Sequence, residues 1–412
     1  MDLNTLCFLL FGLLFTGFLV LDGLDFGVGM LLGAGKTDIE RQALIQTIAP
    51  VWEGNQVWLI VAAGLLFAVF PHVYATLFSG LYLTLFIVLV ALLLRGLAIE
   101  LHNKEEYPAW RRFCYWSVFL GSLVPALVWG IALGSLLAGL PIDSARQYSG
   151  SFLALFTPYS LLSGLTYMLL FVVQGAIYLA WRLEAGLALR LQQSGLAAVS
   201  YAMAAVAVLG ILTVSTTTAG HKGLALLLAA AALGCLYGSR RSLGGGQYLP
   251  GLALSSLAII AQTASLFMGL YPRLLVSSLD ARWSLDIYNA AASPLTLRLI
   301  TTLALIVLPV TIACEVWKFY VFRRPVSLQA IELAPQLPRL RRLREKLTRS
   351  LTYASCLADA LDKTGKALAG TDGAIINKLT ARHRTLLFGK RCVCRRPAGQ
   401  KRPVPGTRQT DK

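Results

Sequence analysis

Nine long apolar stretches dominate this sequence, and they limit what the chain can fold into more than any other feature. Each is near the roughly 20 residues that a helix needs to cross the core of a bilayer. Lipid admits only helices and closed barrels, and these stretches are too long for barrel strands. They lie at Leu6–Leu32, Gln56–Phe70, Tyr74–Leu101, Phe113–Leu140, Phe152–Trp181, Gly195–Val214, Gly223–Tyr237, Pro250–Leu270 and Leu297–Phe322. The sequence therefore predicts an all-α, polytopic transmembrane helical bundle of about nine spans.

Composition supports a membrane protein. Of 412 residues, 56% are hydrophobic and 14% are charged, whereas soluble domains carry about 25% charged residues. The first stretch lacks the basic start and the small-residue cleavage site of a signal peptide, and it contains two aspartates. We therefore expect it to be a permanent transmembrane helix.

Lysine and arginine residues in the connections predict the orientation. Basic side chains concentrate on the cytoplasmic side of membrane proteins. The odd-numbered connections carry nine of them, against five in the even-numbered connections. The N-terminus is therefore expected on the periplasmic side and the C-terminus in the cytoplasm.

The net charge of +17 comes mostly from the C-terminal part. From Arg323 onward there are 21 Lys and Arg residues and 6 Asp and Glu residues. We therefore divide the chain into a membrane domain, residues 1–325, and a basic cytoplasmic tail, residues 326–412, without an assigned function. A solvated extension beside an anionic leaflet is favoured over nucleic-acid binding, for which no motif is present. Within the tail, Leu337–Ser350 is expected to form a basic amphipathic helix and Arg391–Lys412 to be disordered.

Ionisable residues inside spans are costly and therefore mark candidate functional sites. Asp22 and Asp25 are three residues apart on the first helix, so they share a face. Glu53 lies where the second helix begins, and Arg95 and Glu100 lie where the third ends. We expect the three acids of the first two helices to meet Arg95 near the cytoplasmic boundary. One arginine cannot neutralise all four acids, and crowded carboxylates tend to hold protons.

Three interpretations of this cluster remain open at this point. Arg95 neutralises an acid so that the helices pack, the acids form a proton path from the cytoplasm, or they form the cation site of a secondary transporter. Gly23, Gly27 and Gly29 beside the acids allow close helix approach in each case.

Histidine and cysteine residues give no sign of a redox centre. The four histidines fall at helix ends, in loops or in the tail, and no pair is suited to clamp a haem. The seven cysteines are scattered, and no metal-ligand cluster is apparent. We therefore predict no cofactor-binding or metal-binding residue in this chain.

Several motifs carry a family resemblance, in the same order along the chain. They are L-D-G-L-D-F-G-V-G-M-L at Leu21–Leu31, P-V-W-E-G-N-Q-V-W at Pro50–Trp58, F-P-H-V-Y-A-T-L-F-S-G at Phe70–Gly80, Arg95-Gly96 with Glu100, G-S-L-V-P at Gly121–Pro125, and S-L-D-I-Y-N-A-A-A-S-P-L-T-L at Ser284–Leu297. Over about residues 1–325 the chain closely resembles subunit II of the cytochrome bd-type quinol oxidases. Beyond Val326 the resemblance ends.

The resemblance implies a haem-free membrane subunit of a terminal oxidase in the bacterial inner membrane. In that family, quinol oxidation is coupled to reduction of O2 to water. A partner, subunit I, carries two haems b and one haem d and forms a heterodimer with subunit II. Subunit II stabilises subunit I and assists cytoplasmic proton delivery. The resemblance also allows a small accessory subunit and a structurally bound quinone, and it implies contact with membrane lipids and none with nucleic acid.

Motif positions transfer roles to particular residues. By the resemblance Glu53, Asp25 and Asp22 are proton-path candidates, with Arg95 as their electrostatic organiser and Glu100 beside them. Residues Trp52, Trp58 and Asn55 are packing or channel-lining candidates. The alternative is a secondary transporter, which should show repeated halves with paired broken helices; no such repeat is evident.

Overall fold

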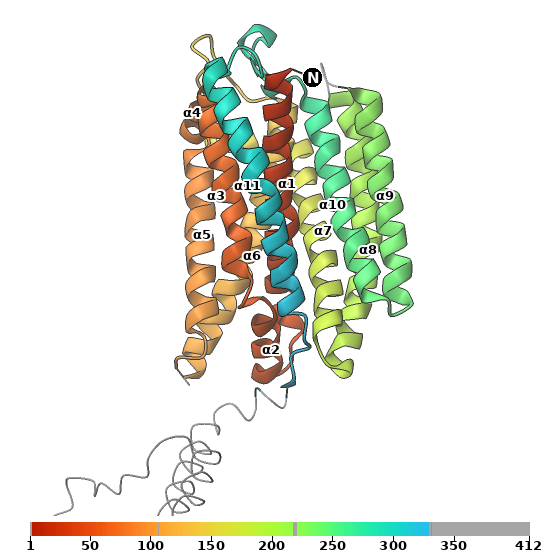
Figure 1. Cartoon of the computed structure of the whole chain (residues 1–412). Helices are drawn as coiled ribbons and strands as arrows, with labels where there is room; N and C mark the ends of the chain where they lie inside the picture. The colour runs from red at the N-terminus through yellow and green to blue at the C-terminus, as the bar shows by residue number, and fades with distance from the viewer. Residues whose placement is uncertain (1, 106, 217–220, 329–330, 332–412) are drawn as a thin grey trace, which may run out of the picture. The chain divides into compact units, whose positions relative to one another are not determined.

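The computed structural model of the chain describes residues 2–105, 107–216, 221–328 and 331. These residues belong to one compact unit that is almost entirely helical (Figure 1). Its elements, in chain order, are α1 (Leu3–Met30), η1 (Leu31–Ala34), α2 (Asp38–Ile48), α3 (Trp52–Val69), α4 (Pro71–Gly80), α5 (Tyr82–Leu101), α6 (Pro108–Ala138), η2 (Phe152–Leu155), α7 (Pro158–Arg182), α8 (Ala185–Thr216), α9 (Lys222–Gly244), α10 (Tyr248–Leu270), β1 (Arg273–Leu275), η3 (Ala281–Trp283), β2 (Leu285–Asp286) and α11 (Pro294–Val321).

Among the described residues, nine helices are long and apolar enough to cross a membrane, so the predicted number of spans is confirmed. They are α1 continued by η1, α3, and α5 to α11. The two remaining α-helices are short: α2 has 11 residues and α4 has 10. The all-α polytopic bundle predicted from the sequence is the observed fold.

Several predicted span boundaries were wrong. The stretch Tyr74–Leu101 is two helices, because the chain leaves helical geometry at Leu81, between α4 and α5. At this break Gly80 packs so closely that a Cβ on it would lie 2.4 Å from Cβ of Tyr148. Hydropathy cannot detect such a bend, because the apolar run continues through it.

Other boundaries differ because helices extend beyond their apolar cores. The second span begins at Trp52 rather than Gln56, so W-E-G-N forms the first turn of α3. The sixth begins at Ala185, and the seventh ends at Gly244. The fifth begins later than predicted, at Pro158, where Thr157 caps the helix by accepting from the Ser160 amide.

Helix α1 is the centre of the bundle. It contacts α3 and α6, and also α7 and α10 (Figure 1). Glycines permit the closest of these contacts: a Cβ on Gly27 would lie 1.9 Å from the carbonyl oxygen of Phe171, and one on Gly175 would lie 2.4 Å from the Gly27 carbonyl carbon. A Cβ on Gly23 would meet the Phe171 ring at 2.4 Å, and one on Gly29 the Ser122 hydroxyl at 2.0 Å. The predicted role of these α1 glycines in close helix approach is confirmed.

Helix α11 lies on the outside of the bundle, against α1 and α3 (Figure 1). Only 6% of the residues in its apolar window are buried, against 56% for α1. The small area that α11 buries therefore depends on a few inward-facing side chains.

Beyond α11 the chain returns to the end of α7. The Val326 amide donates to the carbonyl oxygen of Arg182 at 2.8 Å, and the Leu328 amide donates to Oε1 of Glu184 at 3.2 Å. Ile331 is 6% exposed. The helix predicted at Leu337–Ser350 and the disorder predicted for Arg391–Lys412 lie outside the described residues, and the division at residue 326 stays a prediction.

Candidate functional site

A buried ionic cluster joins α1 to α5. Asp22, Asp25 and Arg95 are each 0% exposed. Nη1 of Arg95 donates to Oδ1 of Asp22 at 3.2 Å, and Nη2 lies 3.7 Å from Oδ2 of Asp25. The two aspartates present one face because three residues advance a helix by nearly a full turn. The arginine thus bridges both carboxylates, as the sequence predicted.

Two neighbours hold the arginine in place. Its guanidinium carbon lies 4.8 Å from the centre of the Phe26 ring, in a cation–π contact. On α6, a Cβ on Gly121 would lie 2.6 Å from Cβ of Arg95, so the missing side chain lets α5 and α6 approach closely here. Both contacts restrict the positions available to Arg95.

Asn55 brings α3 into the cluster. It is fully buried, and its Nδ2 donates to Oδ2 of Asp25 at 2.7 Å and to the Leu21 carbonyl at 3.2 Å. A buried carboxylate is stabilised by each donor that it accepts from. Asn55 is therefore a direct hydrogen-bond partner of Asp25. The sequence had predicted only a packing or channel-lining role for it.

Helix α11 supplies a second cation. Nζ of Lys318 donates to Oδ1 of Asn55 at 2.7 Å and to the Val51 carbonyl at 3.4 Å, and it forms an ion pair with Glu315. Oε1 of Glu315 accepts from Nε1 of Trp58 at 3.5 Å. The result is a continuous network across α5, α1, α3 and α11, which we call the four-helix network: Arg95, Asp22, Asp25, Asn55, Lys318, Glu315 and Trp58.

The four-helix network holds one more acid than base. Its acids are Asp22, Asp25 and Glu315, and its bases are Arg95 and Lys318. If every group were ionised, the network would carry one uncompensated negative charge in a bundle of apolar helices. Such a charge is expensive in a low-dielectric interior. One proton held by the carboxylates removes the excess.

Two predicted members of the cluster lie elsewhere. Glu53 and Glu100 are exposed, and neither has a hydrogen-bond or ion-pair partner among the residues that the structure describes. The expectation that Glu53 joins the aspartates was wrong, because at 3.6 residues per turn it lies about 160° around α3 from Asn55. Glu100 lies about 140° around α5 from Arg95. Whether either residue handles protons stays a prediction.

The tryptophans that flank Glu53 pack against glycines. A Cβ on Gly96 of α5 would lie 2.8 Å from the Trp52 ring, and one on Gly17 of α1 would lie 2.5 Å from the Trp58 ring. These contacts fit the packing interpretation of both residues. Trp58 adds a polar contact that the sequence did not reveal, through its indole N–H to Glu315.

Lys318 and Glu315 are the residues that sequence reasoning missed. The signal was available, because they are the two charged side chains three residues apart in the last apolar span. The same criterion that singled out Asp22 and Asp25 applies to them. Only the packing of α11 on α3 shows that they face the aspartates.

The described histidines lie at helix ends. His72 is exposed at the start of α4, and His221 is exposed before α9, where its ring stacks on Tyr271. His102, just beyond α5, is buried, and this burial lowers its pKa; its Nδ1 hydrogen-bonds with the Ile99 carbonyl at 2.8 Å. Within the described residues no group of three or more His, Cys, Asp or Glu side chains is placed to hold a metal ion.

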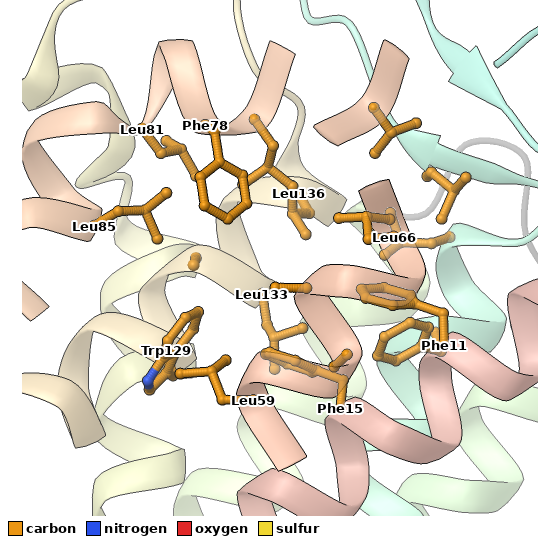
Figure 2. A pocket seen from close by; sticks show the side chains of 18 of the residues that line it. Phe11, Phe15, Leu59, Leu66, Phe78, Leu81, Leu85, Trp129, Leu133 and Leu136 are labelled. Atoms are coloured by element: carbon orange, nitrogen blue, oxygen red, sulfur yellow. The ribbon is translucent and has the colours of Figure 1, made fainter. Parts of the chain in front are cut away.

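An apolar cavity of about 90 Å³ lies between the N-terminal half of α1 and the helices α3, α4, α5, α6 and α10. Figure 2 shows Phe11, Phe15, Leu59 and Trp129 among its lining side chains. Pockets for drug-sized ligands are about 300–1,000 Å³. The cavity is smaller than this range and has room for small apolar molecules; the structurally bound quinone that the resemblance allows stays a prediction.

Known proteins are similar to this chain along most of its length. Residues 3–322 match the family model of cytochrome bd terminal oxidase subunit II. Cytochrome bd ubiquinol oxidase subunit 2 of Bacillus subtilis is 35% identical over 335 residues, covering 79% of this chain and 97% of the relative. Cytochrome bd-I ubiquinol oxidase subunit 2 of Escherichia coli is 32% identical over 370 residues, covering 80% of this chain and 97% of the relative.

A match of this extent includes all nine spans and every residue of the four-helix network. The chain belongs to the cytochrome bd terminal oxidase subunit II family.

Proposed function

We propose that this chain is the haem-free membrane subunit of a cytochrome bd-type terminal quinol oxidase, which stabilises the haem-bearing subunit I and helps to deliver protons from the cytoplasm. Family membership makes it a subunit of a quinol oxidase complex, an oxidoreductase with a partner subunit 1, and a multi-pass protein of the bacterial inner membrane. The proposal adds the part that this subunit plays in the complex.

The four-helix network is the observation that carries the proton-delivery proposal. Reduction of O2 to water consumes protons, so the complex needs groups that bind and release them. Asp22 and Asp25 are fully buried carboxylates with one arginine between them. Their excess negative charge favours a bound proton, and Arg95 and Asn55 hold the oxygens in position to exchange it. If the aspartates served only to pack the helices, equal numbers of acidic and basic side chains in the network would be enough.

Glu53 is proposed as an outer group of the same path. It is exposed in the first turn of α3, two residues before Asn55. A carboxylate there also favours the helix, because the N-terminal end of a helix is partly positive. Its exposure leaves it open to water or to a partner subunit, whereas Asp25 is enclosed.

The redox groups are proposed to lie on the partner. The resemblance implies two haems b and one haem d on subunit I, and the described histidines of this chain lie at helix ends. The haems would supply the electron transfer to O2, and this chain's residues would supply protons and packing surface. A small accessory subunit remains part of the proposal as a further partner.

A secondary transporter is the rival function. It would use Asp22 and Asp25 as an ion site. One oxygen of each carboxylate accepts a hydrogen bond, from Arg95 or from Asn55. The Arg95 cation beside both carboxylates disfavours a metal cation at the same place. We therefore do not propose transport.

Purification tests the main proposal. Isolation of the chain in mild detergent should bring down a haem-bearing membrane protein and quinol oxidase activity. A chain that purifies alone and colourless, and that supports solute uptake in vesicles, would show the proposal to be wrong.

The proton path is tested separately. Glu53→Gln should slow O2 reduction while haem content stays close to normal, because the substitution removes a proton-carrying group without altering size. The matched control is Glu105→Gln, in the exposed α5–α6 connection. Normal turnover of the Glu53 variant would remove Glu53 from the path.

A further inference from the structure

We propose that Lys318 is a positioning residue that sets the proton affinity of the Asp22–Asp25 pair through Asn55, and that Glu315 balances its charge. This inference rests on the proposed function, because it gives the proton site a control element on the last helix. Neither residue belongs to the cluster expected from the first three helices.

The position of the Lys318 ammonium is the first argument. Lysines near the end of a span usually extend toward the aqueous boundary. Here Nζ turns onto α3, where it meets the oxygens of Asn55, Val51 and Glu315, and the side chain is 16% exposed. A Cβ on Gly54 would lie 3.0 Å from this Nζ, so the glycine of W-E-G-N leaves the space that the ammonium uses.

The orientation of the Asn55 amide is the second argument. A primary amide presents an acceptor oxygen and a donor nitrogen from the same carbon. Lys318 has only donors, so the Asn55 oxygen points to Lys318 and the nitrogen points to Asp25, at 2.7 Å in each case. Lys318 holds the oxygen end of the amide, while Asp25 and the Leu21 carbonyl hold its nitrogen end. With Lys318 removed, only the nitrogen end keeps a partner, and the amide loses the cation that draws its oxygen away from Asp25.

The charges give the effect a sign. Lys318 places a positive charge one amide away from Asp25, which favours the ionised carboxylate. Glu315 places a negative charge beside Lys318, which weakens that effect. The other groups around Asp25 are Asp22 on α1, Arg95 on α5 and the Tyr178 hydroxyl on α7. Tyr178 donates to the Thr47 carbonyl and accepts from Arg182 at 2.8 Å, so its one donor proton is already used and is not available to Asp25.

Removing each member of the ion pair should therefore have opposite effects. In the purified complex, infrared difference spectra would follow the protonated-carboxyl band that disappears in Asp25→Asn. Lys318→Met should raise the pH at which this band is half lost. The expected rise is on the order of one pH unit, because that is the effect of one charge a few ångströms away. Glu315→Gln should lower it. Lys318→Arg, which keeps the charge, should restore most of the wild-type value.

A control variant tests whether the shift requires a charge close to Asp25 or follows from the loss of any positive charge on α11. Arg298 lies exposed on the same helix, about 30 Å along its axis from Lys318 at 1.5 Å per residue. Arg298→Met should leave the midpoint unchanged. Loss of stability alone cannot mimic the expected result, because it would not move two midpoints in opposite directions.

The infrared midpoints test the inference about Lys318, and oxidase turnover tests the proposed function. Equal midpoints in Lys318→Met, Glu315→Gln and wild type, shifts of the same sign, or no band that depends on Asp25 would overturn the inference. If Lys318→Met does not assemble, Glu315→Gln decides alone: a downward shift supports the inference and an unchanged midpoint overturns it. Oxidase turnover reports separately on the proposed function, which fails if Asp25→Asn turns over normally even where the infrared shifts occur.

Discussion

The guanidinium of Arg95 donates a hydrogen bond to the carboxylate of Asp22 across 3.2 Å, and neither side chain is exposed. The two residues are 73 positions apart in the chain. Their contact requires α1 and α5 to be held in register by the helices around them. The pair is therefore a sensitive point at which to test both the fold and the site.

Removal of the arginine should be severely destabilising. Arg95→Gln leaves two buried carboxylates without their shared cation, and loss of one partner of a buried ion pair typically costs about 3–5 kcal/mol. Thermal unfolding of the purified complex should show a large fall in Tm. Arg282→Gln, at an exposed ion pair in the η3 loop, is the control and should have little effect. Equal Tm values for the two variants would contradict the cluster's structural role.

Neutralising one aspartate should separate stability from activity. Asp25→Asn removes the excess charge of the four-helix network, so stability should stay equal or rise. Quinol oxidase turnover should nevertheless fall, by about 10²–10⁴-fold if Asp25 transfers protons directly. Tm and O2 consumption, measured on the same preparation, check both parts. A parallel loss of Tm and turnover would indicate a packing role instead.

Close approach of α1 and α7 predicts intolerance at Gly27. Gly27→Ala would place Cβ 1.9 Å from a main-chain oxygen of Phe171, which cannot rotate away. The helices must separate, and overpacking of this kind costs about 1–3 kcal/mol or more. Gly64→Ala on α3, with nothing within 4 Å of its Cβ, should instead be neutral or slightly stabilising. The yield and Tm of folded protein distinguish the two.

Acid should weaken the structure at His102. Burial lowers the pKa of this imidazole below its ordinary value of 6.5, so below that pH the unfolded chain binds more protons than the folded chain. The stability that His102 contributes is complete above pH 6.5 and is lost as the pH falls through the folded-state pKa. His102→Gln should flatten this part of the Tm–pH curve. An unchanged curve would mean that other groups cause the acid sensitivity.

The network itself was only partly predictable. Asp22, Asp25 and Arg95 were found because charges in apolar stretches are costly wherever the helix packs. Glu53 was misplaced and Lys318 was missed, because membership of the network depends on which face of each helix points inward. A local sequence pattern in a mostly apolar helix does not specify that face.

The number of spans and the presence of a buried ionic site on α1 and α5 could be predicted from the sequence alone. Those conclusions follow from hydrophobicity and the cost of charge in lipid, which are properties of each segment alone. The packing of the helices was needed to show that Asn55 links Asp25 to Lys318, that Glu53 faces outward, and that the Tyr74–Leu101 stretch divides at Leu81. These features arise from contacts between helices far apart in the chain, where the rotation of each helix and the space left by Gly54 and Gly121 determine which polar groups meet.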